Sequence, residues 1–233
     1  MFPYMLWFEE VSSTQELAKE RELPCGTVVV ADRQKKGKGR KGRRWESQEG
    51  GLYFSFVLCE RDFRDFVQLP LVVGFALSLY LEHVGVKTGI KWPNDVYARG
   101  KKISGVLVEK SAGRIVVGVG LNVNQESFPK ELEVGATSMR LITGREHDRR
   151  VVLRGVLDSI SDNVNLYRLK GFKPFKEKIE DRLLFKGEEV VILGDKPEVG
   201  ILIGIDEEGF LLLHTPAGEK RIVAGDVSLR LYR

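Results

Sequence analysis

Two kinds of hydrophobic pattern alternate along the chain. Apolar residues recur at helical spacing in three stretches, which predicts helices at residues 66–84, 149–166 and 173–184. Shorter apolar runs between turn residues predict strands at residues 27–31, 52–58, 88–91, 96–97, 102–110 and 114–122. The turns expected at residues 98–100 and 111–113 are short enough for hairpins. We therefore expect an α+β fold with a mixed, largely antiparallel sheet, rather than repeated βαβ units.

The pattern changes after Lys186. Five strands are predicted in fewer than fifty residues, at 189–193, 200–205, 210–214, 220–223 and 228–232. Glycine, proline and acidic residues separate these runs, and short strands at such close spacing are typical of a small β-barrel. We expect two domains, one at residues 1–186 and one at residues 187–233.

Composition limits the class of protein. A chain of 233 residues with 42% hydrophobic residues can bury the core of a medium-sized domain and of a small one. No apolar run is long enough to cross a bilayer and no basic segment precedes the first apolar residues, so we expect a cytoplasmic protein without membrane contact. Cys25 and Cys59 show no metal-binding spacing. We expect them to be small buried residues in a reducing compartment rather than a disulfide framework.

Positive charge is concentrated in residues 33–45, which we call the basic loop. Eight of its first twelve residues are Lys or Arg and three are Gly, whereas the whole chain carries only +4, which leaves 4 − 8 = −4 elsewhere. The glycines allow close approach of the backbone, and the arginines offer forked donors that suit phosphate or carboxylate. The segment predicts an anion-binding loop; a solvated charged loop and a nucleic-acid patch are the alternatives. Because its charges repel one another, we expect the loop to be mobile until an anion binds.

Residues near the N-terminus predict the start of a helix. Ser13 and Glu16 stand in capping-box register, and we expect Trp7 and Phe8 to pack against the core just before it. Helix N-termini also present unpaired N–H groups beside short polar side chains, so the same residues can contact a ligand.

Two further patterns could carry chemistry. Pro93 predicts an extended bend that displays Asn94 and Asp95 at a strand end, where the carboxylate could anchor Mg²⁺ beside a nucleotide; an ordinary turn is the alternative. Glycine and asparagine then alternate along one face of a strand, at Gly118, Gly120, Asn122 and Asn124. A strand without side chains at two positions leaves that face open to a ligand, unless a helix packs closely on the glycines.

Five motifs resemble those of biotin protein ligases. GKGRKGRRW at residues 37–45 is similar to the GRGRxGRxW loop of that family, with Lys38 where the family usually has Arg. SSTQE, KWPND, KKISGVLVE and GVGLNVN also occur in the family's order, at residues 12–16, 91–95, 101–109 and 118–124. The resemblance implies a catalytic domain like that of class II aminoacyl-tRNA synthetases, followed by an SH3-like barrel.

The resemblance also implies which residues form the site. Those implied to bind biotin are Ser13, Thr14, Gln15, Gln34, Lys38, Gly39, Arg40, Lys102 and Gly105. Those implied to bind the nucleotide are Arg40, Arg43, Trp45, Lys91, Asn94, Lys102 and Asn122. Trp45 is the expected stacking surface for adenine, with a core role as the alternative. Arg40 and Lys102 are the expected catalytic residues, and Asp95 is the expected Mg²⁺ ligand.

The function implied is ligation. The carboxylate of biotin would attack the α-phosphate of ATP to give biotinyl-5′-AMP and pyrophosphate, and a lysine of the biotin carboxyl carrier protein of acetyl-CoA carboxylase would then accept the biotin. A lipoate–protein ligase of the same fold is the nearest alternative, and a nucleic-acid-binding module is the alternative from another class. So few residues precede Ser12 that we expect no DNA-binding domain and no specific DNA binding. The resemblance also suggests a homodimer.

Overall fold

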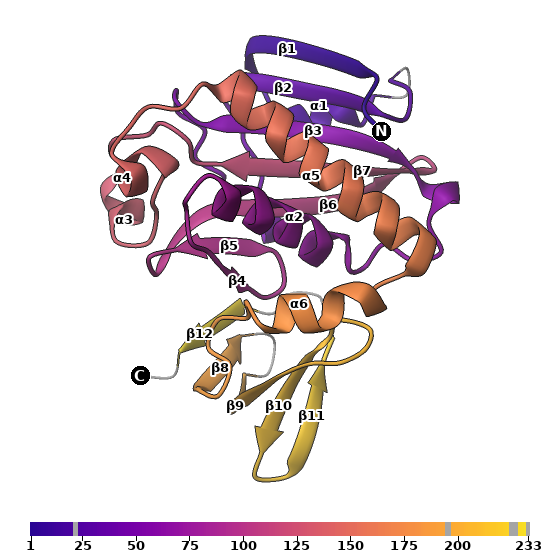
Figure 1. Ribbon diagram of the computed structural model, residues 1–233, viewed down its shortest axis with the longest axis vertical. Helices are drawn as coiled ribbons and strands as arrows, with labels where there is room; N and C mark the ends of the chain where they lie inside the picture. The colour runs from indigo at the N-terminus through magenta and orange to yellow at the C-terminus, as the bar shows by residue number, and fades with distance from the viewer. Residues whose placement is uncertain (21–22, 194–196, 224–227, 232–233) are drawn as a thin grey trace.

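A seven-stranded sheet forms the centre of the computed structural model, which describes residues 1–20, 23–193, 197–223 and 228–231 (Figure 1). Its strands are β1 (Tyr4–Val11), β2 (Thr27–Gln34), β3 (Leu52–Cys59), β4 (Gly89–Lys91), β5 (Asp95–Ala98), β6 (Lys101–Ser111) and β7 (Arg114–Leu121). Their order across the sheet is β1-β2-β3-β7-β6-β5-β4, in which β1 and β2 run parallel and the other neighbours antiparallel. The expected mixed, largely antiparallel sheet is confirmed.

The edge strand β1 is not predicted by the sequence pattern. Its sequence, YMLWFEEV, begins with consecutive apolar residues and shows no alternation. The strand lies at the sheet edge, and backbone pairing to β2 holds it there. Trp7 packs against the core as expected, but Phe8 is 36% exposed.

The two hairpins on either side of β6 form where the sequence predicts them. Arg99 and Gly100 have φ values of 49° and 74°, and Ala112 and Gly113 have values of 49° and 75°. Positive φ at both central residues is the type I′ geometry, which matches the twist of the flanking strands. These turns place β5, β6 and β7 side by side.

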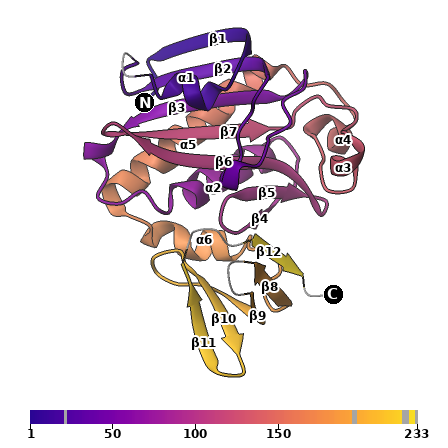
Figure 2. The ribbon, with the colours of Figure 1, turned by 180° about the vertical axis from the view of Figure 1, so that it is seen from behind.

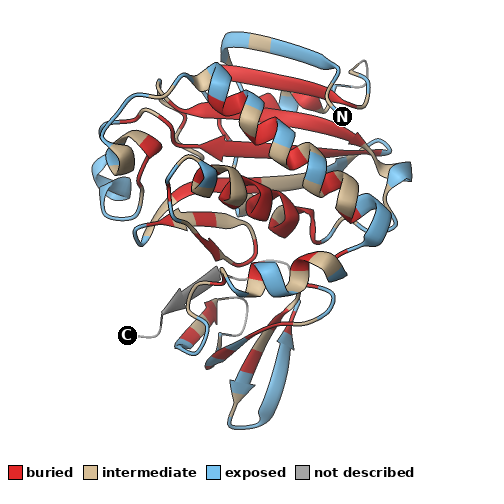
Figure 3. Ribbon diagram, in the orientation of Figure 1, coloured by how far each residue is buried: buried red, intermediate tan, exposed pale blue. Residues whose placement is uncertain are grey.

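Two long helices cover one face of the sheet (Figure 1). They are α2 (Leu69–His83) and α5 (Arg149–Lys170), which also pack against each other. Most of α2 is buried because it lies between the sheet and α5, whereas α5 buries one stripe and exposes the other (Figure 3). The Asp148 side chain caps α5 by accepting hydrogen bonds from the N–H groups of Arg150 and Val151.

The remaining helices are short. They are α1 (Thr14–Ala18), α3 (Lys130–Glu133), α4 (Met139–Thr143), α6 (Lys176–Glu180) and the 3₁₀ turns η1 (Arg40–Gly42), η2 (Glu60–Asp62) and η3 (Lys173–Phe175). The single helix expected at residues 173–184 is wrong, because Ile90 on β4 exchanges backbone hydrogen bonds with residues 182 and 184 and draws that segment out of the helix. The α1 helix lies on the opposite face of the sheet from α2 and α5 (Figure 2).

A second, five-stranded antiparallel sheet follows α6. Its strands are β8 (Glu189–Leu193), β9 (Glu198–Ile205), β10 (Leu211–Thr215), β11 (Gly218–Ile222) and β12 (Ser228–Leu231), in the order β11-β10-β9-β8-β12. The last residue of the strand predicted at 228–232 lies outside the described residues. Trp92 Nε1 donates to the carbonyl of Gly209 (3.0 Å) and Gln68 Nε2 to that of Glu208 (2.6 Å), which joins this sheet to the larger one. No helix in the described ranges is long and apolar enough to cross a membrane.

The expectation of two unpaired buried cysteines is wrong. Cys25 and Cys59 form a disulfide bond, and neither residue is fully buried. The cause is strand register: Val28 on β2 faces Phe56 on β3, and continuing this antiparallel register by three residues brings position 25 opposite position 59. The Cα atoms are 5.5 Å apart. The cysteines therefore no longer support a reducing compartment.

Candidate functional site

A cavity of about 310 Å³ lies over β6 and β7, on the face of the sheet that carries α1. The segment between β2 and β3, which contains all of the basic loop except its first two residues, crosses in front of these strands (Figure 2). Fourteen of the fifteen site residues expected from the sequence line this cavity, namely Ser13, Thr14, Gln15, Gln34, Lys38, Gly39, Arg40, Arg43, Trp45, Asn94, Asp95, Lys102, Gly105 and Asn122. The fold thus gathers side chains from five separate stretches of sequence.

Gly105, Gly118 and Gly120 line the cavity, as the open face expected from the sequence would, and side chains of the domain also lie directly on them. A Cβ on Gly120 would lie 2.2 Å from Trp45 Cε2, and one on Gly105 would lie 2.9 Å from Trp45 Cζ3. A Cβ on Gly118 would lie 2.5 Å from Gln15 Oε1. The glycines therefore allow an indole and a carboxamide, rather than a helix, to lie directly on the sheet.

The basic loop forms its own small hairpin. Trp45 N–H donates to the Gly37 carbonyl (2.9 Å), and Gly39 N–H donates to the Arg43 carbonyl (2.8 Å). The indole of Trp45 is half-buried at the closing end of this hairpin, and Lys102 Nζ lies 5.0 Å from the centroid of its ring. This geometry places Trp45 as a wall of the cavity; its stacking on adenine and the mobility of the loop both stay predictions.

Acidic residues pair with several cations of the basic loop. Lys38 Nζ donates to Glu16 Oε1 (2.7 Å), and Lys35 pairs with Glu10 (2.9 Å). Arg33 pairs with Glu9 and Glu49. Hydrogen bonds from Lys19 and Lys38 lower the pKa of Glu16 below its ordinary value. The charge of the loop is thus partly neutralised by the rest of the domain, which weakens the nucleic-acid alternative.

The start of α1 is tied to the base of the basic loop. Gln34 Oε1 accepts hydrogen bonds from the backbone N–H (2.8 Å) and the hydroxyl (3.1 Å) of Thr14, and Gln34 Nε2 donates to Ser47 Oγ (2.9 Å). Ser13 begins the helix with extended dihedral angles, but its side chain makes no capping bond, so the expected capping box does not form. Its buried hydroxyl has no hydrogen-bond partner among the described residues, so it can donate to or accept from a ligand at the cavity.

Gln15 lies flat on β7 and is 3% exposed. Its Nε2 donates to Glu109 Oε2 (2.9 Å) and to the Val116 carbonyl (3.2 Å), while its Oε1 accepts a hydrogen bond from Ser55 Oγ (3.1 Å). A carbonyl oxygen has two lone pairs, so Oε1 keeps capacity for one further donor. The carboxamide therefore offers an acceptor at the cavity.

Asn94 and Asp95 lie at a tight turn between β4 and β5 rather than the extended bend expected from the sequence. The turn contains a cis peptide bond between Trp92 and Pro93. In the strand register of this hairpin, Lys91 lies directly opposite Asp95. Asn94 Nδ2 donates to the Val106 carbonyl (2.8 Å), which fixes the turn against β6. A short hairpin connection leaves no room for an extended bend.

The two expected catalytic cations meet this turn. Lys102 Nζ lies 2.7 Å from Asp95 Oδ1, and Arg40 Nη1 donates to Asn94 Oδ1 at 3.3 Å. The oxygens that could hold a cation are thus facing Lys102 and Arg40. In the described part of the chain no three His, Cys, Asp or Glu side chains come together to hold a metal, and Asp95 offers one carboxylate at this turn.

Lys91 and Asn122 are both expected to contact the nucleotide, but only Asn122 lies at the cavity. Lys91 does not line the cavity, because it lies on the outermost strand, with its ammonium 5.4 Å from the centroid of the Tyr97 ring. Asn122 does line the cavity, but its Nδ2 donates to the Thr137 carbonyl (2.9 Å) and its Oδ1 accepts from Gln125 Nε2 (3.3 Å). Because Nδ2 has a second hydrogen and Oδ1 a second lone pair, Asn122 keeps capacity for one further donor and one further acceptor contact at the cavity.

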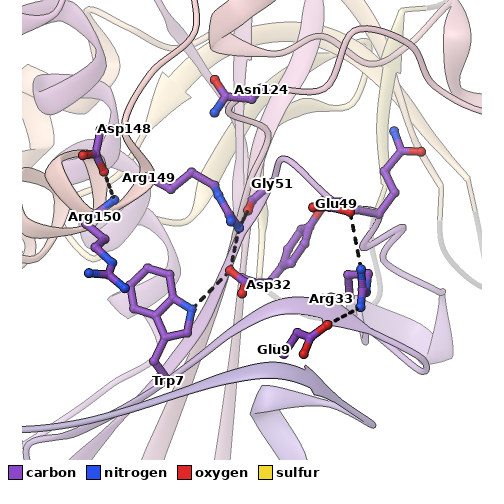
Figure 4. Close-up of polar contacts among 12 residues, drawn as sticks. Trp7, Glu9, Asp32, Arg33, Glu49, Gly51, Asn124, Asp148, Arg149 and Arg150 are labelled. Carbon is purple, nitrogen blue, oxygen red and sulfur yellow. Dashed lines mark hydrogen bonds and ion pairs between the residues drawn. The ribbon is translucent and has the colours of Figure 1, made fainter.

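A network of polar contacts fixes the segment that follows the basic loop (Figure 4). Asp32 Oδ1 accepts a hydrogen bond from Trp7 Nε1 (3.1 Å) and lies 2.7 Å from Arg149 Nη1. Arg149 also donates to the carbonyl of Gly51 (3.2 Å), and the Arg150 guanidinium lies 5.7 Å from the Trp7 ring centroid. The edge strand, the start of α5 and the start of β3 are thereby held together.

One wall of the cavity is missing from the sequence-based site. It comes from the segment after β7, and its residues are Phe128, Glu131, Leu132, Gly135 and Ala136. Lys102 N–H donates to the Gly135 carbonyl (2.8 Å) and Lys102 O accepts from Thr137 N–H (2.9 Å), which holds this wall beside β6. These residues carry no distinctive spacing, so no sequence signal identifies them.

Comparisons with known proteins add to this geometry. The model of the biotin/lipoate A/B protein ligase family matches residues 7–126, and that of the biotin protein ligase C-terminal domain matches residues 186–230. The chain is 37% identical to the bifunctional ligase/repressor BirA of Bacillus spizizenii, over 98% of this chain and 75% of that protein. It is 31% identical to the biotin–[acetyl-CoA-carboxylase] ligase of Mycobacterium tuberculosis, over 87% of this chain and 78% of that protein.

A solved structure is also similar over the whole chain. The biotin protein ligase from Aquifex aeolicus, in complex with biotin and ATP, is 48% identical and has a TM-score of 0.95, covering 99% of this chain and 100% of that one. The biotin protein ligase from Leishmania major in complex with biotinyl-5-AMP is 22% identical, with a TM-score of 0.68, and shares the fold.

Proposed function

This chain belongs to the biotin/lipoate A/B protein ligase family, and from that membership we propose that it joins biotin to a lysine of a carrier protein through biotinyl-5′-AMP. One observation carries the proposal. Fourteen expected site residues meet in a single cavity, in a chain that is 48% identical along its length to a ligase solved with biotin and ATP.

The first reaction needs no general base. The carboxylate of biotin is ionised at neutral pH, and one of its oxygens attacks the α-phosphorus of ATP. The bond from that phosphorus to the bridging oxygen breaks, so that pyrophosphate leaves with the electron pair and biotinyl-5′-AMP forms. The obstacle is repulsion between two anions, which cations placed at the cavity can offset.

Lys102 is the central cation of this step. Its ammonium lies 2.7 Å from Asp95 Oδ1 and 5.0 Å from the centroid of the Trp45 ring. We propose that Lys102 exchanges Asp95 for the carboxylate of biotin and the α-phosphate when the substrates bind. Arg40, already directed at Asn94 in the same turn, would contact the phosphates.

Mg²⁺ forms part of the proposal. Once Lys102 has moved to the substrates, the Asp95 carboxylate would be released to hold the ion, and an ion that takes few protein ligands and several phosphate oxygens fits this single carboxylate. When bound, Mg²⁺ would neutralise phosphate charge. Asn94 Oδ1 lies at the same turn and is the other oxygen available.

The second reaction transfers the biotin. The amine of a carrier lysine attacks the acyl carbon of the adenylate, an amide forms, AMP leaves, and the amine loses a proton. The relative from M. tuberculosis is named for acetyl-CoA carboxylase. We propose the biotin carboxyl carrier protein of that enzyme as the acceptor.

Mass spectrometry tests the proposal directly. The purified chain is incubated with biotin, ATP and Mg²⁺, and biotinyl-5′-AMP is sought in the bound and released fractions. Exchange of pyrophosphate into ATP is then measured with biotin and with lipoate. We expect stimulation by biotin; stimulation by lipoate alone would assign the chain to the lipoate branch of the family, and stimulation by neither acid would reject adenylation.

A further inference from the structure

The carboxamide of Gln15 is held in one direction by groups behind it. Its Nε2 faces Glu109 Oε2 at 2.9 Å and the Val116 carbonyl at 3.2 Å, and neither of these oxygens can donate. A flipped carboxamide would set Oε1 against two acceptors. The nitrogen must therefore point to Glu109, and the oxygen must point to Ser55 and the cavity.

Glu109 does not itself line the cavity. It lies on β6 directly across from Val116 on β7, so that its side chain and the Val116 carbonyl meet the same nitrogen. The oxygen that accepts from Gln15 also pairs with Lys19 Nζ at 2.9 Å. Lys19 in turn pairs with Glu16 at 2.8 Å, so the carboxylate is held from the solvent side as well.

We propose that Glu109 is a positioning residue that sets the direction of the Gln15 carboxamide and so fixes a hydrogen-bond acceptor at the cavity. This inference rests on the proposed function and on the expectation from the sequence that Gln15 binds biotin, here through its ureido ring. The ring offers N–H donors, which a carboxamide oxygen accepts and a carboxamide NH₂ repels. Glu109 thus acts on a substrate that it does not touch.

Gly118 supports the same assignment. The position opposite Gln15 on β7 has no side chain, and a Cβ there would lie 2.5 Å from Gln15 Oε1. The carboxamide therefore lies in a slot bounded by the sheet beneath it, Ser55 at its oxygen and Glu109 at its nitrogen. Closing the slot from beneath with Gly118→Ala should also raise the KM for biotin.

A double-mutant cycle tests the role of Glu109. Glu109→Leu removes the acceptor, and we expect the KM for biotin to rise about tenfold, while the KM for ATP and kcat at saturating biotin stay the same. Glu109→Gln keeps an oxygen for Gln15 and Lys19, so it should restore a KM close to that of the wild type. In a Gln15→Ala background, Glu109→Leu should add no further increase.

A matched control separates positioning from folding. Lys19→Met removes the ion pair with Glu109 but leaves the bond to Gln15, so we expect an unchanged KM for biotin. The proposal would be overturned if Glu109→Leu raised the KM for biotin equally in the wild-type and Gln15→Ala backgrounds, or raised it in neither. Failure of the wild-type chain to form biotinyl-5′-AMP would instead reject the proposed function.

Discussion

The disulfide between Cys25 and Cys59 should contribute substantially to stability. It links the start of β2 to the end of β3 and spans 34 residues. In the chain-entropy model, closing a loop of this length in the unfolded chain corresponds to about 4 kcal/mol at 25 °C. With an unfolding entropy of about 2.1 cal/mol/K per residue, a 233-residue chain should then lose about 8 °C in Tm when the bond is absent.

Calorimetry of four samples measures this effect. Wild type and the double variant Cys25→Ser/Cys59→Ser are each scanned with and without a reducing agent. We expect the reductant to lower the Tm of the wild type to that of the variant, and to leave the variant unchanged. Adenylate formation at 25 °C should be equal in all four samples, because neither cysteine lines the cavity.

The same bond makes a second, independent expectation. Thiol titration of the oxidised, denatured wild type should find no free thiol, since the structure pairs both cysteines of the chain. Equal melting temperatures of the oxidised and reduced wild type would refute the entropic reasoning. A titration that finds two thiols after mild oxidation would refute the pairing itself.

Three further predictions concern the site. Lys102→Ala should lower the rate of adenylate formation at least a hundredfold. Lys101→Ala should leave the rate unchanged, because the Lys101 ammonium donates to the Glu133 carbonyl and does not line the cavity; similar rates of pyrophosphate exchange in both variants would exclude the role of Lys102. Gly120→Ala should displace the indole of Trp45 and lower the free energy of unfolding by about 1–3 kcal/mol. We expect altered tryptophan fluorescence and a lower Tm; an unchanged fluorescence spectrum would contradict the contact. The lowered pKa of Glu16 means that its contribution to stability is present above pH 4.5 and is lost as pH falls through its folded-state pKa. Protease cleavage in the basic loop should therefore increase on acidification in the wild type, and should increase less in Glu16→Gln, in which the pair of Lys35 with Glu10 remains pH-sensitive.

Local features of the fold follow directly from the sequence. The helices around α2 and α5 and the strands β6 and β7 have the expected periodicity, and the turns at residues 98–100 and 111–113 form as hairpins. Each of these depends on residues that are near one another in the chain, where side-chain spacing and backbone preference decide the outcome. The motifs likewise identify the family and most of the residues that line the cavity.

Strand pairing and side-chain packing decided the rest. Register brings Cys25 to Cys59, pairing with Ile90 shortens the helix expected at 173–184, and the position of β4 at the sheet edge keeps Lys91 out of the cavity. The bond between Gln15 and Glu109 joins residues 94 positions apart. Periodicity reports which face of an element is apolar, but only the packed sheet determines which side chains from distant elements share that face. The sequence therefore determined the elements and the chemical groups of this protein, and the tertiary structure decided which of those groups meet.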